Sequence, residues 1–98
     1  MLFVVTSYAT GCDTRPGSRT KAGTLPVAGF TIAADPAVLP LGSIVRVEGL
    51  GERMVHDVGS AVRGRHVDVF ARSCAEARQF GKQRRRLRVL HVPLSARR

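Results

Sequence analysis

Two carboxylates, Asp57 and Asp68, lie where ionisation would be unfavourable. Asp57 ends the segment RMVHD (53–57) and Asp68 lies inside RHVDVF (65–70), and both segments lean towards apolar residues. The chain has seven acidic residues against sixteen Lys and Arg, so acidic side chains are scarce in it. Burial among β-branched neighbours penalises a charged carboxylate. When two carboxylates share a partly dry site, the pKa of one of them rises, and that group keeps its proton near neutral pH.

Such a pair has the chemistry that cleavage of a glycosidic bond requires. One group donates a proton to the leaving oxygen, and the other places negative charge near a positively charged transition state. Asp35, at the end of the apolar segment 30–35, is a third candidate for the same cleft. The alternative is that Asp57 and Asp68 accept backbone N–H bonds and cap turns, as aspartate often does. The spacing alone leaves both interpretations open.

The segments that would position these residues have the pattern of short strands. A period of two places His66, Asp68 and Phe70 on one face of their segment, opposite two valines. The same kind of pattern, bounded by turn residues, predicts six strands and one long loop: strands at 2–8, 30–35, 43–49, 53–57, 65–70 and 86–92, and the loop at 11–29. Alternation in the last strand places three side chains on one face: Leu87, Val89 and His91.

One helix is predicted, at residues 73–81. Ser73 is a good N-cap, Glu76 completes a capping box, and Gly81 lies where a helix commonly ends. Six short strands and one small helix favour a mainly β fold, a compact closed barrel with few exposed edges. A chain of 98 residues supports one modest core, so a single domain over 1–98 is expected.

The net charge of +9 indicates an anionic partner. Nucleic acid, acidic lipid and bacterial wall polymer all meet this description, and basic residues are locally dense in GKQRRRLR and in the terminal SARR. A nucleic-acid-binding domain would more often show a recognition helix or stacking aromatics among its charges, and neither is apparent, so no nucleic-acid partner is expected. A solvated basic face without a partner is the alternative.

Cysteine and histidine spacing gives little evidence of a cofactor. Cys12 and Cys74 form either a disulfide, worth roughly 4 kcal/mol in the chain-entropy model, or two buried thiols. No Cys, His or Asp set has metal-ligand spacing, so no metal or other cofactor is expected, and His56 and His91 are predicted to be structural. The opening MLFVV is too short for a signal-peptide core or a membrane span, so no span is expected.

Several stretches together resemble the 3D domain, a bacterial and phage family named for three aspartates. They follow in order from about residue 6 to 90: TSYATGC, TKAG, TIAADPAVLPLGSIVRVEGLG, HDVGSAVRGRHVDVF and CAEARQFGK. The resemblance implies a six-stranded double-psi β barrel similar to the catalytic barrel of the MltA-type lytic transglycosylases.

The resemblance also implies an activity: cleavage of peptidoglycan glycan strands between N-acetylmuramic acid and N-acetylglucosamine, without water as nucleophile, leaving 1,6-anhydromuramic ends. By the same resemblance Asp68 is the single acid/base. Asp57 supports it by raising its pKa and stabilising positive charge at C1. Substrate contacts are expected from further positions: Asp35, Tyr8, Thr20, Gly59 and His66.

The sequence departs from the family pattern beside both aspartates. The family usually reads Asp-Thr-Gly-Gly where this chain has DVGS, so Val58 and Ser60 stand in place of Thr and Gly. The change at position 58 removes a hydroxyl that can hydrogen-bond substrate. Two positions before the third aspartate, which is Asp68 here, the family usually has a basic residue, and this chain has His66. A protonated His66 would favour ionised Asp68 and oppose its acid role, whereas a neutral one can hydrogen-bond the carboxyl or a sugar.

Three functions are consistent with the sequence. The first is the enzyme, a lytic transglycosylase or related glycan hydrolase, and the second is a module that binds wall glycan without cutting it. The third, a nucleic-acid binder, requires strongly salt-dependent binding that survives loss of the aspartates. The resemblance implies action in the periplasm or cell wall. We expect a phage-delivered protein, such as an endolysin, or an excised domain whose groove other domains complete.

Overall fold

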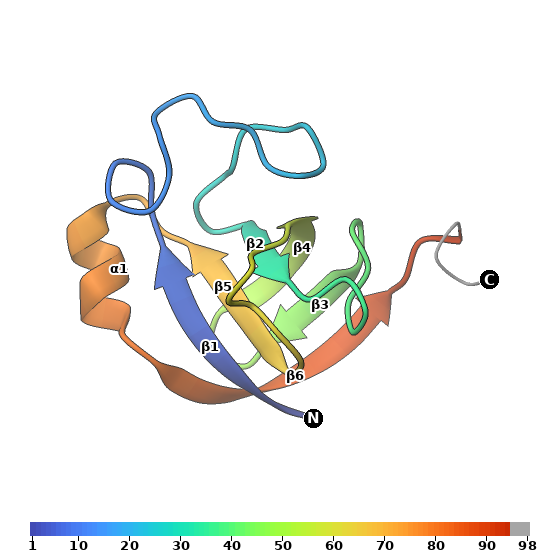
Figure 1. The fold of residues 1–98 in the computed structure, drawn as a ribbon. Helices are drawn as coiled ribbons and strands as arrows, with labels where there is room; N and C mark the ends of the chain where they lie inside the picture. The colour runs from blue at the N-terminus through green and yellow to red at the C-terminus, as the bar shows by residue number, and fades with distance from the viewer. Residues whose placement is uncertain (95–98) are drawn as a thin grey trace.

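The computed structural model describes residues 1–94 as a six-stranded barrel with one helix beside it (Figure 1). The predicted basic run at 95–98 lies outside the described residues. The elements, in chain order, are β1 (Leu2–Tyr8), β2 (Thr31–Ala34), β3 (Ile44–Val47), β4 (Gly51–Asp57), β5 (His66–Phe70), α1 (Cys74–Phe80) and β6 (Gln83–His91). Within residues 1–94, no helix has the length and apolar character needed to cross a membrane.

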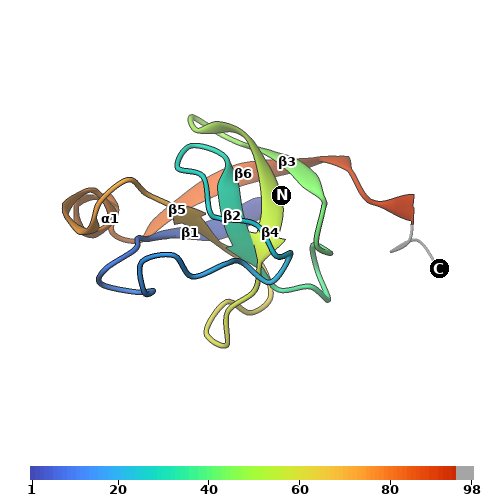
Figure 2. The same ribbon diagram turned by 90° about the horizontal axis from the view of Figure 1, so that it is seen from above.

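The strands close into a barrel in the order β1-β5-β2-β4-β3-β6, and β6 returns to β1. The pairs β1/β5 and β2/β4 are parallel, and the other four are antiparallel. Figure 2 shows α1 at one end of the molecule, outside the barrel. The mainly β fold, the closed six-stranded barrel and the single short helix are confirmed, and the two parallel pairs are consistent with a double-psi barrel.

Alternating valines fill the barrel interior. Val45 and Val47 of β3 and Val67 of β5 are fully buried, while Arg46 between the first two points to solvent. β-branched side chains suit this position because they pack well on a pleated surface. The predicted alternation in these two strands is therefore confirmed.

The last strand differs from its prediction at both ends. It begins at Gln83, three residues before the predicted start, because its first residues extend the pairing with β1. Arginines at alternate positions can be solvated there while Leu87 enters the core. Val89 and His91, which the alternation placed on one face with the buried Leu87, are both exposed, and the β3/β6 register shifts beside them. The other strand ends lie within two residues of prediction.

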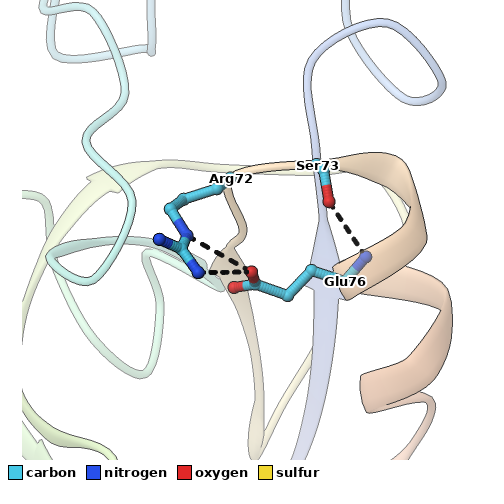
Figure 3. A network of polar contacts seen from close by, with 3 residues as sticks. All are labelled: Arg72, Ser73 and Glu76. Atoms are coloured by element: carbon cyan, nitrogen blue, oxygen red, sulfur yellow. Dashed lines mark hydrogen bonds and ion pairs between the residues drawn. The ribbon is translucent and has the colours of Figure 1, made fainter.

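The helix begins and ends as predicted, with one difference in its cap (Figure 3). The Ser73 hydroxyl accepts a hydrogen bond from the Glu76 N–H at 3.1 Å, and Gly81 has a φ of 64° and donates to the Ala77 carbonyl. The Glu76 carboxylate contacts the Arg72 guanidinium at 3.3 Å. In a full capping box the Glu76 carboxylate would also accept the Ser73 N–H, but here it contacts Arg72 instead. The structure therefore has only the Ser73 half of the predicted capping box.

A disulfide joins the helix to the turn that follows β1. Cys12 and Cys74 are bonded, with Cα atoms 6.0 Å apart and 62 positions apart in the chain. Of the two alternatives that the sequence left open, the structure has the bridge. It fixes the turn at residues 9–14 against the start of α1.

Candidate functional site

Strand register brings Asp57 and Asp68 together around one small residue. Ala33 of β2 pairs with Asp68 of β5 on one side and with Asp57 of β4 on the other. Because neighbouring strands lie ~4.8 Å apart and paired side chains share a face, the two carboxylates flank the Ala33 methyl group. A larger side chain at this position would fill the space between them.

A cavity of about 270 Å³ opens over this row. Its walls come from the end of β1, the turn after it, and the loop between β4 and β5: Thr6, Ser7, Tyr8, Asp13, Thr14, Ala33, Asp57, Val58, Gly59, Val62 and Asp68. A Cβ atom at Gly59 would lie 3.0 Å from Val62 Cγ2, so glycine is what allows the loop to pack this closely. The predicted site residues Tyr8, Gly59, Asp57 and Asp68 thus line one cavity.

Asp68 has the electrostatics of a carboxyl group that resists ionisation. Burial is the largest cause of its raised pKa, and the neighbouring Asp13 and Asp57 carboxylates add to the rise. A hydrogen bond from the Thr6 hydroxyl to Asp68 Oδ1, at 2.9 Å, and the nearby His66 act in the opposite direction. Within the described residues, only Oδ1 of this carboxyl group is hydrogen-bonded.

His66 reaches Asp68 through Thr6. The Thr6 hydroxyl lies 2.8 Å from His66 Nε2 as well as 2.9 Å from Asp68 Oδ1. A hydroxyl has one proton and two acceptor lone pairs, so this bridge can run in either direction. Ionised Asp68 accepts from Thr6, which accepts from an Nε2–H of His66. Protonated Asp68 can instead donate to Thr6, which then donates to a bare Nε2.

Asp57 is held by several donors. Its Oδ1 accepts the N–H groups of Lys21 and Val58, both at 3.0 Å, and its Oδ2 lies 3.5 Å from the Tyr8 hydroxyl. Burial is the main cause of a raised Tyr8 pKa, with both aspartates adding to it, so the phenol keeps its proton and remains a donor. Tyr8 also packs edge-on against Phe70.

The third predicted aspartate, Asp35, has a different environment. Its two oxygens accept the N–H groups of Ala37 and Gly64, at 3.0 and 2.9 Å. These backbone hydrogen bonds are the main reason that its pKa is lowered. Asp35 is not among the residues that line the cavity. It fastens the loop between β4 and β5 and therefore influences the cavity from outside.

Thr20 likewise lies outside the cavity lining. Its side chain is buried, and its hydroxyl lies 2.9 Å from that of Thr24. The turn it stabilises is anchored where Ala22 donates to the His56 carbonyl, and this anchor brings Lys21 N–H to Asp57.

Among the lining residues that the sequence did not reveal, Thr6 and Asp13 are the two that act on the pKa of Asp68. Thr6 is placed by the parallel register of β1 with β5, which pairs it with Asp68. Asp13 is held by the Ala9 N–H, which donates to its Oδ2 at 2.9 Å. The outward period of β1 would have been a signal for Thr6. An irregular turn gave no comparable signal for Asp13.

The remaining histidines lie away from the carboxylate pair. His56 Nδ1 is 3.0 Å from the Thr31 hydroxyl, and its ring meets Phe30 edge-on. His91 is exposed at the end of β6. Among residues 1–94, no group of three or more His, Cys, Asp or Glu side chains is placed to hold a metal ion.

Solved structures with a similar fold include MltA from E. coli. It superimposes with a TM-score of 0.64 at 19% identity, covering 83% of this chain and 29% of MltA. E. coli MltA with bound chitohexaose gives 0.67 at 18% identity, covering 78% of this chain and 28% of that one. The lytic transglycosylase LtgG of Burkholderia pseudomallei gives 0.61 at 23%, covering 74% and 26%. At these identities the likeness establishes the barrel fold alone.

Sequence relatives come from Bacillus subtilis (strain 168). The chain is 39% identical over 83 residues to "Cell wall-binding protein YocH", covering 85% of this chain and 26% of YocH. It is 42% identical over 60 residues to "Putative cell wall shaping protein YabE", covering 61% of this chain and 15% of YabE. The chain thus spans about a quarter or less of these relatives. The family model of the 3D domain matches residues 30–92, more than half of the chain, and the chain therefore belongs to the 3D domain family.

Proposed function

We propose that this domain cleaves the glycan strands of peptidoglycan, with Asp68 as the acid that protonates the glycosidic oxygen. The observation that carries the proposal is a carboxyl group of raised pKa that faces a cavity beside a second carboxylate. A general acid must hold its proton near the working pH, and burial, with the Asp13 and Asp57 carboxylates adding to it, shifts the pKa of Asp68 in that direction.

The proposed reaction has two steps. Asp68 donates its proton to the glycosidic oxygen as the C1–O bond breaks, and the Asp57 carboxylate stabilises the positive charge that develops at C1. The C6 hydroxyl of the muramic residue then bonds to C1 and returns its proton to Asp68. The product is a 1,6-anhydro sugar, and no water is consumed. A hydrolase would place water at C1 instead.

Thr6 has a positioning role in this scheme. It holds Oδ1 of Asp68 at 2.9 Å, which leaves Oδ2 to direct its proton into the cavity. Because Thr6 stands between His66 and Asp68, the imidazole influences the acid through a hydroxyl and need not bind it directly. This geometry reconciles a histidine at position 66 with an acid at position 68.

The comparisons support a cell-wall glycan as the substrate class. The barrel fold is similar to that of lytic transglycosylases, one of which was solved with bound chitohexaose, and the names of both Bacillus relatives refer to the cell wall. We also infer action outside the cytoplasm, since a disulfide persists in oxidising compartments. The chain would act as one domain, and further domains would complete the groove.

A second function, binding of wall glycan without cleavage, is favoured by the name of YocH. In that case the same cavity would hold a sugar through Asp57 and Asp68 without breaking a bond. The two functions differ in their products and share a ligand.

One experiment separates them. Purified peptidoglycan is incubated with the wild type, with Asp68→Asn, and with Glu52→Gln, a matched carboxylate-to-amide change at an exposed site away from the cavity. With the wild type and with Glu52→Gln, mass spectrometry should find muropeptides that are lighter by one water than reducing-end muropeptides. With Asp68→Asn, the amount of these products should be at least roughly a hundredfold lower. Reducing-end products would indicate a hydrolase. Cosedimentation of all three proteins without products would leave the binding function.

A further inference from the structure

A row of arginines shares the outer face of the barrel with the carboxylate site. Val4 of β1 pairs with His66 of β5 on one side and with Arg84 of β6 on the other. Paired residues point to the same face and neighbouring strands lie ~4.8 Å apart, so the backbones of His66 and Arg84 are about 10 Å apart. Further along β1, Leu2 pairs with Arg86. The arginine row, Arg84 and Arg86, therefore continues the site face across β1.

Both guanidinium groups of the arginine row are available to a ligand. Arg84 and Arg86 are exposed, and among residues 1–94 neither forms an ion pair. Arg85, between them, points inward and donates to the Glu48 carbonyl at 2.9 Å. Arg46 on β3 differs again, since Glu52 pairs with it at 2.9 Å. Among residues 1–94, the guanidinium groups of Arg84 and Arg86 thus form neither a hydrogen bond nor an ion pair, whereas those of Arg85 and Arg46 are already bonded.

An apolar strip lies between the arginine row and His66. Leu2 is 52% exposed and Val4 is half-buried, and together they form the outer face of β1 at this level. A ligand that crosses from the cavity to the arginines would pass over uncharged side chains. The face as a whole offers a carboxylate site, an apolar strip and a cationic end.

We propose that Arg84 and Arg86 form a subsite for acidic peptides attached to the glycan strand, whose carboxylates they bind while the sugar lies at Asp68. The subsite rests on the proposed function and specifies its substrate as peptide-bearing glycan. A guanidinium matches a carboxylate through two parallel hydrogen bonds. Asp68 lies two residues along β5 from His66, so its backbone is about 12 Å from that of Arg84, a distance that an extended peptide of about four residues spans.

The test measures binding with cleavage removed. The Asp68→Asn protein is titrated by calorimetry with soluble peptidoglycan fragments that carry their peptides, and with the same fragments after an amidase has removed them. Arg84→Gln is added to this protein and compared with Arg88→Gln, which removes another exposed arginine of β6, one that pairs with β3. Arg84→Gln should weaken binding of the peptide-bearing fragments roughly tenfold and leave the peptide-free fragments unchanged. Arg88→Gln should change neither by more than about twofold.

Three outcomes would overturn the subsite. Equal weakening of both fragment types by Arg84→Gln would indicate a general charge effect. No weakening of either would remove the arginine row from binding. If Arg84→Gln weakened binding of inorganic polyphosphate, titrated in the same way, and left the peptide-bearing fragments unaffected, the row would be assigned to a phosphate-bearing polyanion. Cleavage is scored separately with the Asp68-containing protein, so a protein that binds through Arg84 and cuts nothing would refute the proposed reaction and leave the subsite intact.

Discussion

The hydroxyl of Thr6 controls the proton of Asp68 at the scale of one residue. Its hydrogen bond lowers the pKa of Asp68 against the effect of burial. Thr6→Val removes the donor and keeps the shape, so the pKa of Asp68 should rise further. The ¹³C NMR titration of the Asp68 carboxyl should therefore move to higher pH, and Thr6→Ser should restore the wild-type titration. An unchanged titration in Thr6→Val would contradict the role given to this hydroxyl.

Asp68 should also affect stability in a way that depends on pH. Its pKa in the folded protein is raised, so the folded state holds the proton more tightly than the unfolded state does. Its contribution is fully present below the unfolded pKa of 3.8 and is lost as pH rises through the folded value. Asp68→Asn carries no such charge. Thermal melts should show a higher Tm for Asp68→Asn than for wild type at pH 7, and a smaller difference at pH 3.

At the scale of elements, β2 creates the cavity by placing a small residue between two acids. Ala33→Leu should fill the space between Asp57 and Asp68, and overpacking should lower the free energy of unfolding by about 1–3 kcal/mol. Binding of glycan fragments should fall at least roughly tenfold while the circular dichroism spectrum is kept. Ala37→Leu, an exposed change in the next turn, is the control and should leave binding as in the wild type. Undiminished binding by Ala33→Leu would place the ligand elsewhere.

The disulfide between the turn at 9–14 and α1 should stabilise the whole domain. Closing a loop of 62 positions restricts the unfolded chain by about 4 kcal/mol in the chain-entropy model. Urea unfolding of the Cys12→Ser, Cys74→Ser double variant should show a loss near that size. The wild type in excess dithiothreitol should approach the same midpoint. Equal midpoints for oxidised and reduced wild type would contradict this, since they would show that the disulfide does not stabilise the folded domain relative to the unfolded chain.

Local sequence pattern was enough to predict the helix and the strands, but it was not enough to predict which strands pair and in which register. Val45, Val47 and Val67 revealed their strands because alternation is visible in consecutive residues. The placement of Ala33 between two acids depends on β2 pairing with both β4 and β5, which no local pattern encodes. For the same reason sequence reasoning proposed Asp35 for the cleft, since its position after an apolar strand was visible and its hydrogen bond to Gly64 was not.

At the scale of the whole molecule, the net charge of +9 should concentrate the protein on anionic cell walls. Exposed charges separated by more than the Debye length are screened, and that length falls from about 10 Å at 0.1 M salt to about 3 Å at 1 M. Cosedimentation with purified walls should therefore weaken as NaCl rises from 0.1 to 1 M. Binding to chitin, a largely neutral glycan, should change much less. Equal salt dependence of binding to walls and to chitin would show that the net charge does not drive wall binding.

The pairing of β1 with β6 means that the barrel can close only when strands from both ends of the described residues, 1–94, are available. β1 begins at Leu2, yet one of its two hydrogen-bonded neighbours is a strand that starts at Gln83, so the ring closes only through contacts far apart in sequence. Such contacts make folding slow, on the scale of milliseconds to seconds for barrels of this kind. A ribosome-bound nascent chain therefore holds β1 with an open edge until Arg86 has emerged, and this is the interval in which a chaperone is most useful to it.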